Sequence, residues 1–240
     1  MKRFKEKNDP HPVIRIRNVT RTFREGAVER SVLRNISIDF APGEIVILLG
    51  RSGSGKSTLL NLLGAIDRPS SGEILVQGTD LARLSEHERT LFRRRNVGFI
   101  FQFFNLVSTL TVKENLLLPL ELNRSLGPEA DERAMALLDE VGLGNRADSF
   151  PDRLSGGEQQ RGAIARALIH DPPILLADEP TGNLDFETGR HIIGLLDDLV
   201  RRKGRNLVMA THSRELMGMA DRIFTLRHGA LVPMEEGIPS

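Results

Sequence analysis

The stretch between residues 45 and 63 constrains the fold most. The unbroken apolar run Ile45–Leu49 precedes the glycine-rich sequence GRSGSGKST, and the apolar, helix-like run 59–63 follows it. A strand, a glycine-rich turn, a Lys-Ser pair and a helix form the context that a phosphate-binding loop requires. Glycines let successive backbone N–H groups turn toward phosphate oxygens, where a Cβ would obstruct the approach. The start of the helix adds unpaired N–H groups and the positive end of its dipole.

This loop predicts a nucleoside triphosphate site. Lys56 is expected to reach the β- and γ-phosphates, and the hydroxyl of Ser57 is expected to ligate Mg²⁺. The alternative is a glycine turn that merely joins a strand to a helix. The predicted nucleotide-binding residues of the loop are Gly50, Arg51, Ser52, Gly53, Ser54, Gly55, Lys56, Ser57 and Thr58.

Composition narrows the class of protein. The 240 residues allow one large domain or two small ones. A formal net charge of +1 argues against a general nucleic-acid role, and the absence of cysteine excludes disulfides and cysteine-ligated zinc. No stretch approaches the roughly 18 consecutive apolar residues of a membrane span, so we expect at most a peripheral membrane protein. The basic clusters at 93–95 and 201–205 are interpreted as solvated helix faces or ends.

Hydrophobic patterning predicts an α/β fold with a parallel sheet. Short apolar runs without alternation indicate strands that are buried on both faces, whereas partial alternation indicates antiparallel strands with one wet face. A helical pattern between 112 and 142 interrupts the sheet and predicts an inserted α-helical subdomain at about 103–156. We expect one domain over 13–232, with flexible tails at 1–12 and 233–240. The expected buried strands are 45–49, 97–101, 174–177, 207–210 and 223–226, and the expected antiparallel strands are 13–19 and 31–40.

Two adjacent carboxylates end one of these buried strands. Asp178 and Glu179 follow the apolar run 174–177, at the sheet edge where ligands bind in open α/β folds. Asp178 suits Mg²⁺, which prefers few carboxylates together with phosphates. Glu179 suits a general base that polarises an attacking water. Solvated acids at a strand end are the alternative, and the phosphate loop disfavours it.

A second glycine-rich helix start lies at Leu154–Arg161. Ser155 and Glu158 have the spacing of a capping box, so a well-made helix N-terminus is the simplest interpretation. However, Gly156 and Gly157 each cost about 1 kcal/mol of helix propensity relative to Ala. That cost indicates a backbone which something must approach closely, such as a second anion.

These motifs together resemble the ATP-binding-cassette ATPases. Leu154–Arg161 is similar to the signature motif of that family, Asn183-Leu184-Asp185 to its D-loop, and Thr211-His212 to its switch histidine. Gln102 follows a strand as in the family, and the motifs keep the family's order across nearly the whole chain. The resemblance implies a P-loop NTPase (RecA-like) core with a parallel sheet, an antiparallel β subdomain and the inserted helical subdomain.

The resemblance also implies roles for individual residues. ATP on the loop of one subunit is expected to be covered by Ser155, Gly156, Gly157 and Glu158 of a second copy, in a head-to-tail homodimer. Gln102 is expected to contact Mg²⁺ and the attacking water, and His212 the γ-phosphate. The implied catalytic residues are Glu179, His212 and Gln102, the implied Mg²⁺ ligands are Ser57, Gln102 and Asp178, and the D-loop residue is Asp185.

One position departs from the family pattern. The family stacks adenine on an aromatic residue, often Tyr, upstream of the loop, and this chain contains no Tyr and no Trp. Phe23 occupies the matching place and can stack. Its alternative is a core position beneath the antiparallel strands.

The expected partner is an integral membrane permease. Phe103, Phe104 and Leu106 follow a strand in a segment expected at the surface, where the family receives a short permease helix; packing inside the helical subdomain is the alternative. The segments 109–120 and 180–185 resemble the lipoprotein-release, macrolide-export and cell-division branch. The implied protein is an ATPase subunit on the cytoplasmic face of the inner membrane, which drives export, lipoprotein release or force transmission.

Three other functions were compared with this one by the sequence features that each would require. A cassette ATPase that regulates cell-wall enzymes would have the same motifs. A nucleic-acid-acting cassette protein usually needs tandem cassettes or long coiled coils, for which 240 residues leave no room. A small-molecule kinase would need an acceptor pocket and would not need Ser155–Glu158.

Overall fold

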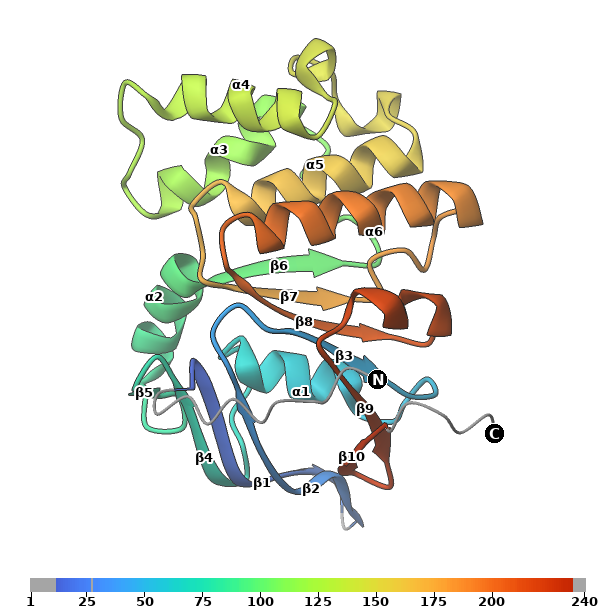
Figure 1. Ribbon diagram of the computed structural model, residues 1–240. Helices are drawn as coiled ribbons and strands as arrows, with labels where there is room; N and C mark the ends of the chain where they lie inside the picture. The colour runs from blue at the N-terminus through green and yellow to red at the C-terminus, as the bar shows by residue number, and fades with distance from the viewer. Residues whose placement is uncertain (1–11, 27, 235–240) are drawn as a thin grey trace.

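A computed structural model describes residues 12–26 and 28–234 of the chain. Two sheets and the helices between and above them form the layers of the molecule (Figure 1). Most of the two predicted tails lies outside the described residues. Pro233, which was assigned to the C-terminal tail, ends strand β10 (Ala230–Pro233) instead.

The larger sheet has six strands in the order β10-β9-β3-β8-β7-β6. β3 pairs in parallel with β8 and β9, and β7 pairs in parallel with β8 and β6. Only β10, at one edge, is antiparallel to its neighbour. The strands are β3 (Ile45–Leu49), β6 (Val97–Phe101), β7 (Ile174–Asp178), β8 (Asn206–Thr211) and β9 (Arg222–Arg227).

Both faces of this sheet are covered, as the unbroken apolar runs predicted. Every residue of β3 is buried, and alternate residues contribute to two different cores. Val46 and Leu48 pack toward helix α1 (Lys56–Leu63) and the second sheet, whereas Ile45 and Ile47 pack toward the helices of the opposite layer. Those helices are α5 (Gly156–Leu168) and α6 (Phe186–Arg201).

The smaller sheet is antiparallel and has the order β2-β1-β4-β5. β1 (Ile14–Glu25) and β2 (Val28–Phe40) extend beyond the predicted ranges, and β4 (Ser71–Val76) and β5 (Thr79–Asp80) complete the sheet. Helix α1 lies between the two sheets, and its buried leucines belong to the same core as Ile14 and Ile16 (Figure 1).

The remaining helices are α2 (Glu86–Asn96), α3 (Val112–Leu122) and α4 (Ala130–Glu140). α3 and α4 lie beyond α5, in the layer farthest from the antiparallel sheet, and both fall inside the range expected for the inserted subdomain (Figure 1). Capping boxes start α2, α3 and α5, each with a Ser or Thr at the N-cap and a Glu at N3. Short 3₁₀ segments occur at Gly144–Arg146, Pro151–Arg153 and Arg214–Met219.

No helix in the described part of the chain is both long and apolar enough to cross a membrane.

The prediction that the basic cluster at 201–205 is solvated was wrong for one residue. Arg205 was expected on a solvated surface, but it is buried, with one guanidinium nitrogen on the Leu199 carbonyl and another on the Asp171 carboxylate. The Asp171 carboxylate offsets the charge of the buried guanidinium, although its Nε has no hydrogen-bond partner among the described residues.

Candidate functional site

Strand register brings four predicted motifs to one edge of the parallel sheet. Leu49 of β3 is level with Thr211 of β8, Ala210 of β8 is level with Asp178 of β7, and Asp178 is level with Phe101 of β6. The carboxyl ends of parallel strands meet at the same edge. The segments that follow these four strands therefore start next to one another, although they lie far apart in the sequence. They carry the phosphate loop, Gln102, Glu179 and His212.

The phosphate loop runs from the end of β3 into α1. Gly55 has φ +106°, and a Cβ at this position would lie 2.9 Å from Cγ1 of Val32 and 3.1 Å from Cδ2 of Leu33. Only glycine fits both the left-handed backbone and the close approach of β2. The loop is thereby held against the antiparallel sheet, with the first turn of α1 directly behind it.

Lys56 is almost fully buried within this loop. Its ammonium donates to the Gly50 carbonyl at 2.8 Å and to the Arg51 carbonyl at 3.4 Å, and lies 3.5 Å from Oε1 of Glu179. A buried cation bound by the loop's own carbonyls is poised to exchange them for phosphate oxygens. The loop therefore holds a positive charge at the sheet edge.

Asp178 and Ser57 meet beside the loop. Burial raises the pKa of Asp178 and the charge of Glu179 adds to the rise, whereas the nearby Ser57 hydroxyl and Lys56 act to lower it. A half-buried carboxylate, a hydroxyl and a second carboxylate nearby form a hard-oxygen environment with excess negative charge. This environment fits a hard divalent cation such as Mg²⁺.

Glu179 is held on three sides. Its Oε2 lies 2.9 Å from Nδ1 of His212 and accepts the backbone N–H of the same residue at 3.3 Å, while Oε1 faces Lys56. Its own backbone N–H donates to the Ala210 carbonyl at 2.9 Å. Glu179 also has φ +47°, a left-handed conformation that is costly for a side chain with a Cβ. Such strain at a charged residue beside the phosphate loop is characteristic of functional positions.

Gln102 is tied to the segment that precedes α6. Its Nε2 donates to Oδ1 of Asn183 at 3.0 Å, and Nδ2 of Asn183 donates back to the Gln102 carbonyl at 3.1 Å. A Cβ on Gly182 would lie 2.8 Å from the Gln102 amide nitrogen. Asp185 caps α6 by accepting the Thr188 N–H at 3.0 Å, which lowers the pKa of Asp185.

The glycine-rich start of α5 has the predicted capping box. The Ser155 backbone N–H donates to Glu158 at 2.8 Å, and the Glu158 N–H donates to the Ser155 hydroxyl at 3.3 Å. These contacts lower the pKa of Glu158, with Arg146 adding to the effect. Ser155 itself stays exposed.

Side chains of this same chain already lie close to the two signature glycines, Gly156 and Gly157. A Cβ on Gly157 would lie 2.6 Å from Cγ2 of Thr188, and one on Gly156 would lie 3.3 Å from Cδ2 of Leu184. Packing of α5 against the start of α6 therefore already requires glycine at 157. The second anion site was predicted from the helix-propensity cost of these glycines. At Gly157, packing within this chain already explains that cost.

Sequence reasoning gave no role to Gln160, which connects these parts. Its side chain is fully buried, and Nε2 donates to the Pro180 carbonyl at 2.6 Å and to the Phe101 carbonyl at 3.5 Å. Gln160 therefore joins the signature helix to the ends of β6 and β7. The signal available in the sequence was a glutamine on a helix face whose other residues are small and apolar.

The predicted docking residues divide into two groups. Phe103 is 71% exposed, whereas Phe104 and Leu106 are half-buried against α5. Cζ of Phe104 and Cδ1 of Leu106 each lie 3.6 Å from the positions that a Cβ on Gly156 and Gly162, respectively, would take. Arg166 of α5 donates to the carbonyls of Phe104 and Asn105, and burial lowers the pKa of Arg166.

Phe23 lies on β1, half-buried, with the guanidinium of Arg21 4.4 Å from its ring centroid. It is absent from the packed core of the antiparallel sheet, which argues against the core interpretation. The strand places Phe23 opposite Arg30 of β2, two residues from the part of β2 that packs on the phosphate loop.

Comparison with known proteins agrees with this geometry. The sequence profile of the family described as ABC transporter matches residues 33–182. An uncharacterized ABC transporter ATP-binding protein of Mycobacterium tuberculosis is 51% identical over 222 residues, covering 92% of this chain and 90% of the relative. The lipoprotein-releasing system ATP-binding protein LolD of Gluconobacter oxydans is 47% identical, covering 92% of this chain and 95% of LolD.

A longer relative and a solved structure are also similar to this chain. The macrolide export ATP-binding/permease protein MacB of Syntrophobacter fumaroxidans is 42% identical, with 92% of this chain matching 31% of MacB. The dimeric structure of the ATP-binding cassette MJ0796 in a post-hydrolysis state, bound to ADP and Pi, superposes with a TM-score of 0.85 at 38% identity, covering 94% of this chain and all of the other.

Proposed function

Because this chain belongs to the ABC transporter family and is an ATP-binding, ATP-hydrolysing subunit of such a transporter, we propose that it works as a dimer. Two copies close head to tail over two ATP molecules and thereby drive a separate membrane permease. The LolD and MacB names favour lipoprotein release or export over regulation of cell-wall enzymes. The work takes place on the cytoplasmic face of the membrane.

The position of Glu179 carries the hydrolytic part of this proposal. Its carboxylate lies at the sheet edge between His212 and Lys56. Glu179 accepts a proton from the water that attacks the γ-phosphorus, and the phosphoanhydride bond breaks to give ADP and phosphate. His212 orients Glu179 and contacts the γ-phosphate. Lys56 and the loop N–H groups neutralise the charge that develops on the phosphate oxygens, with no covalent intermediate.

Magnesium is the cofactor that this site fits. Ser57 and Asp178 would hold it, and Gln102 would contact it from the neighbouring strand end. Bound Mg²⁺ would supply positive charge that offsets the charge of the phosphates. Gln102 links this position to the D-loop through Asn183.

The proposed dimer completes the site with the signature residues. Ser155 is exposed at the start of α5, where its hydroxyl and the helix N-terminus offer hydrogen bonds to phosphate. Ser155–Glu158 of one copy closes over the phosphate loop of the other, with Asp185 at the same interface. ATP then joins the two copies, and its hydrolysis releases them.

Reconstitution with a permease tests the proposal. A candidate membrane permease, sought among the neighbouring reading frames, is co-purified with this chain and placed in lipid vesicles, and ATPase activity is measured with and without it. We expect the permease to bind and to change the rate of ATP hydrolysis. Co-purification without any change in that rate contradicts a motor role and favours a regulatory one.

A further inference from the structure

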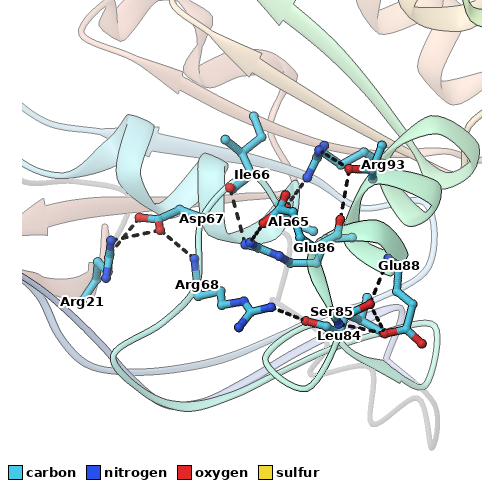
Figure 2. A network of polar contacts seen from close by, with 12 residues as sticks. Arg21, Ala65, Ile66, Asp67, Arg68, Leu84, Ser85, Glu86, Glu88 and Arg93 are labelled. Atoms are coloured by element: carbon cyan, nitrogen blue, oxygen red, sulfur yellow. Dashed lines mark hydrogen bonds and ion pairs between the residues drawn. The ribbon is translucent and has the colours of Figure 1, made fainter.

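The guanidinium of Arg21 covers one face of the Phe23 ring. Both residues lie on β1, two positions apart and therefore on the same face of the strand, and the guanidinium carbon is 4.4 Å from the ring centroid. Arg21 also forms a two-pronged ion pair with Asp67, Nε to Oδ2 at 2.8 Å and Nη2 to Oδ1 at 2.9 Å (Figure 2). Such a fork fixes the plane of the guanidinium as well as its position.

Asp67 is itself attached to the end of α1. Its backbone N–H donates to the Asn61 carbonyl at 3.2 Å, and its Oδ1 also accepts the Arg68 N–H at 2.7 Å. Two arginines of α2 also hold this segment: Arg89 donates to the Ile66 carbonyl, and Arg93 donates to the Ala65 carbonyl (Figure 2 labels Arg93 and Ala65). The carboxylate that orients Arg21 thus lies in the segment directly after α1, the helix whose first turn follows the phosphate loop.

The part of β2 that pairs with Arg21 packs on the phosphate loop. Arg21 is paired across the sheet with Leu33, whose Cδ2 lies 3.1 Å from the position of a Cβ on Gly55. Val32, at the irregularity in register beside Arg21, approaches the same position to 2.9 Å. Arg21 and Phe23 therefore lie on the strand next to the segment that holds the nucleotide loop.

We propose that Arg21, oriented by Asp67, is a positioning residue for the adenine of ATP, acting through the Phe23 ring. This rests on the proposed function and on the stacking of adenine on Phe23 that the family resemblance implies. Arg21 occupies one ring face and leaves the other to adenine. A cation over one face draws π-electron density toward itself, so the opposite face attracts the electron-rich purine more strongly.

The arrangement also compensates for a missing group. The chain has no Tyr and no Trp, so no aromatic hydroxyl or indole N–H can anchor the platform. Arg21 and Asp67 fix the ring instead, and a ring that is fixed before binding loses less side-chain entropy when adenine arrives.

A purely structural ion pair is the competing explanation. Arg21 and Asp67 join β1 to the α1–β4 connection, and both side chains are partly exposed. Loss of such a pair would lower thermal stability, and it would weaken the binding of every ligand of the loop equally. Only the positioning role distinguishes a ligand that has a base from one that has none.

The test measures the affinities of ATP and inorganic tripolyphosphate, both by displacement of a fluorescent ATP analogue from the full chain. We compare wild type, Arg21→Met, Phe23→Leu and the double variant. Arg21→Met is expected to weaken ATP binding about three- to tenfold, to leave tripolyphosphate binding unchanged, and to raise KM for ATP without changing kcat. The double variant is expected to bind ATP no more weakly than Phe23→Leu alone, because Arg21 acts through the ring. Arg21→Lys, which keeps the charge but not the fork, is expected to restore part of the affinity.

Arg17→Met is the matched control. Arg17 lies on the same strand and forms the same kind of fork with Asp39, but among the described residues it stacks on no aromatic ring. We expect this variant to bind ATP like the wild type.

The outcomes separate this proposal from the one on which it rests. Equal losses of ATP and tripolyphosphate binding in Arg21→Met, or additive losses in the double variant, overturn the positioning role and leave the proposed function intact. Unchanged ATP binding in Phe23→Leu overturns adenine stacking, and the role of Arg21 with it. A wild-type chain that binds neither ligand overturns the proposed function itself.

Discussion

Nδ1 of His212 lies 2.9 Å from Oε2 of Glu179. The two residues follow adjacent parallel strands, β7 and β8, whose register pairs Asp178 with Ala210, so both leave the sheet at the same edge. The His212 backbone N–H reaches the same oxygen at 3.3 Å, so the carboxylate is oriented by backbone as well as by side chain. The fold thus preforms the pair that the proposed hydrolysis requires.

Glu179→Gln is expected to slow ATP hydrolysis by about 10²–10⁴-fold, because an amide cannot accept the proton of the attacking water. The amide oxygen keeps an acceptor for His212, so ATP binding survives and an ATP-bound dimer accumulates. Steady-state ATPase assays and size-exclusion chromatography with ATP measure both effects. Glu121→Gln, at an exposed position of α3, is the control and should behave as wild type. Near-normal turnover in Glu179→Gln would rule out the base assignment.

Ser155→Arg is expected to abolish hydrolysis while each monomer still binds ATP. A bulky cation at the exposed start of α5 blocks closure of a second copy over the phosphate loop, although the loop itself is untouched. The change also removes a helix cap, which costs about 1 kcal/mol of stability.

Thr111→Arg controls for that loss of stability. It removes the equivalent capping box of α3, with Glu114 as its partner, in a place with no assigned catalytic role. We expect this variant to melt at a lower temperature and to retain its ATPase activity. Normal hydrolysis by Ser155→Arg would show that the active site is not shared between copies.

Sequence reasoning identified the strand ends because their signal is local. An apolar run followed by GRSGSGKST, by Asp178-Glu179 or by Thr211-His212 specifies both a buried strand and the chemistry at its carboxyl end. Parallel pairing then brings these ends together, whatever lies between them in the chain.

Contacts between segments far apart in sequence were not predictable in this way. The mutual hydrogen bonds of Gln102 and Asn183 and the burial of Gln160 depend on how α5 and the segment before α6 pack on the sheet. The same holds for Phe104 and Leu106, whose apolar side chains could face either a partner or α5. Only packing distinguishes the two, and it places both against α5.

Phe103→Ser is expected to leave folding and ATP binding unchanged but to uncouple the chain from its permease. Phe103 is 71% exposed, so a polar side chain there removes little internal packing. Phe104→Ser is expected to lower the melting temperature by a few degrees, because that ring packs on Gly156 of α5. Leu126→Ser, at another exposed apolar position, is the control and should not affect coupling. Permease-stimulated ATPase activity and thermal melts provide the readouts; a stability loss in Phe103→Ser would contradict a docking role.

Asp178→Asn is expected to stabilise the chain in the absence of Mg²⁺ and ATP while removing Mg²⁺-dependent hydrolysis. Burial raises the pKa of Asp178 in the folded state. A carboxyl whose folded pKa is raised contributes stability below its unfolded pKa, and this contribution is lost as pH rises through the folded pKa. At neutral pH the ionised group therefore opposes folding, and the neutral amide relieves that cost. We expect Tm at pH 7 to rise, and the gain over wild type to shrink as pH falls through the folded pKa of Asp178. Asp152→Asn, at an exposed carboxylate, should show neither effect. A lower Tm at pH 7 for Asp178→Asn would mean that the favourable effects of Ser57 and Lys56 on the charged carboxylate outweigh its desolvation.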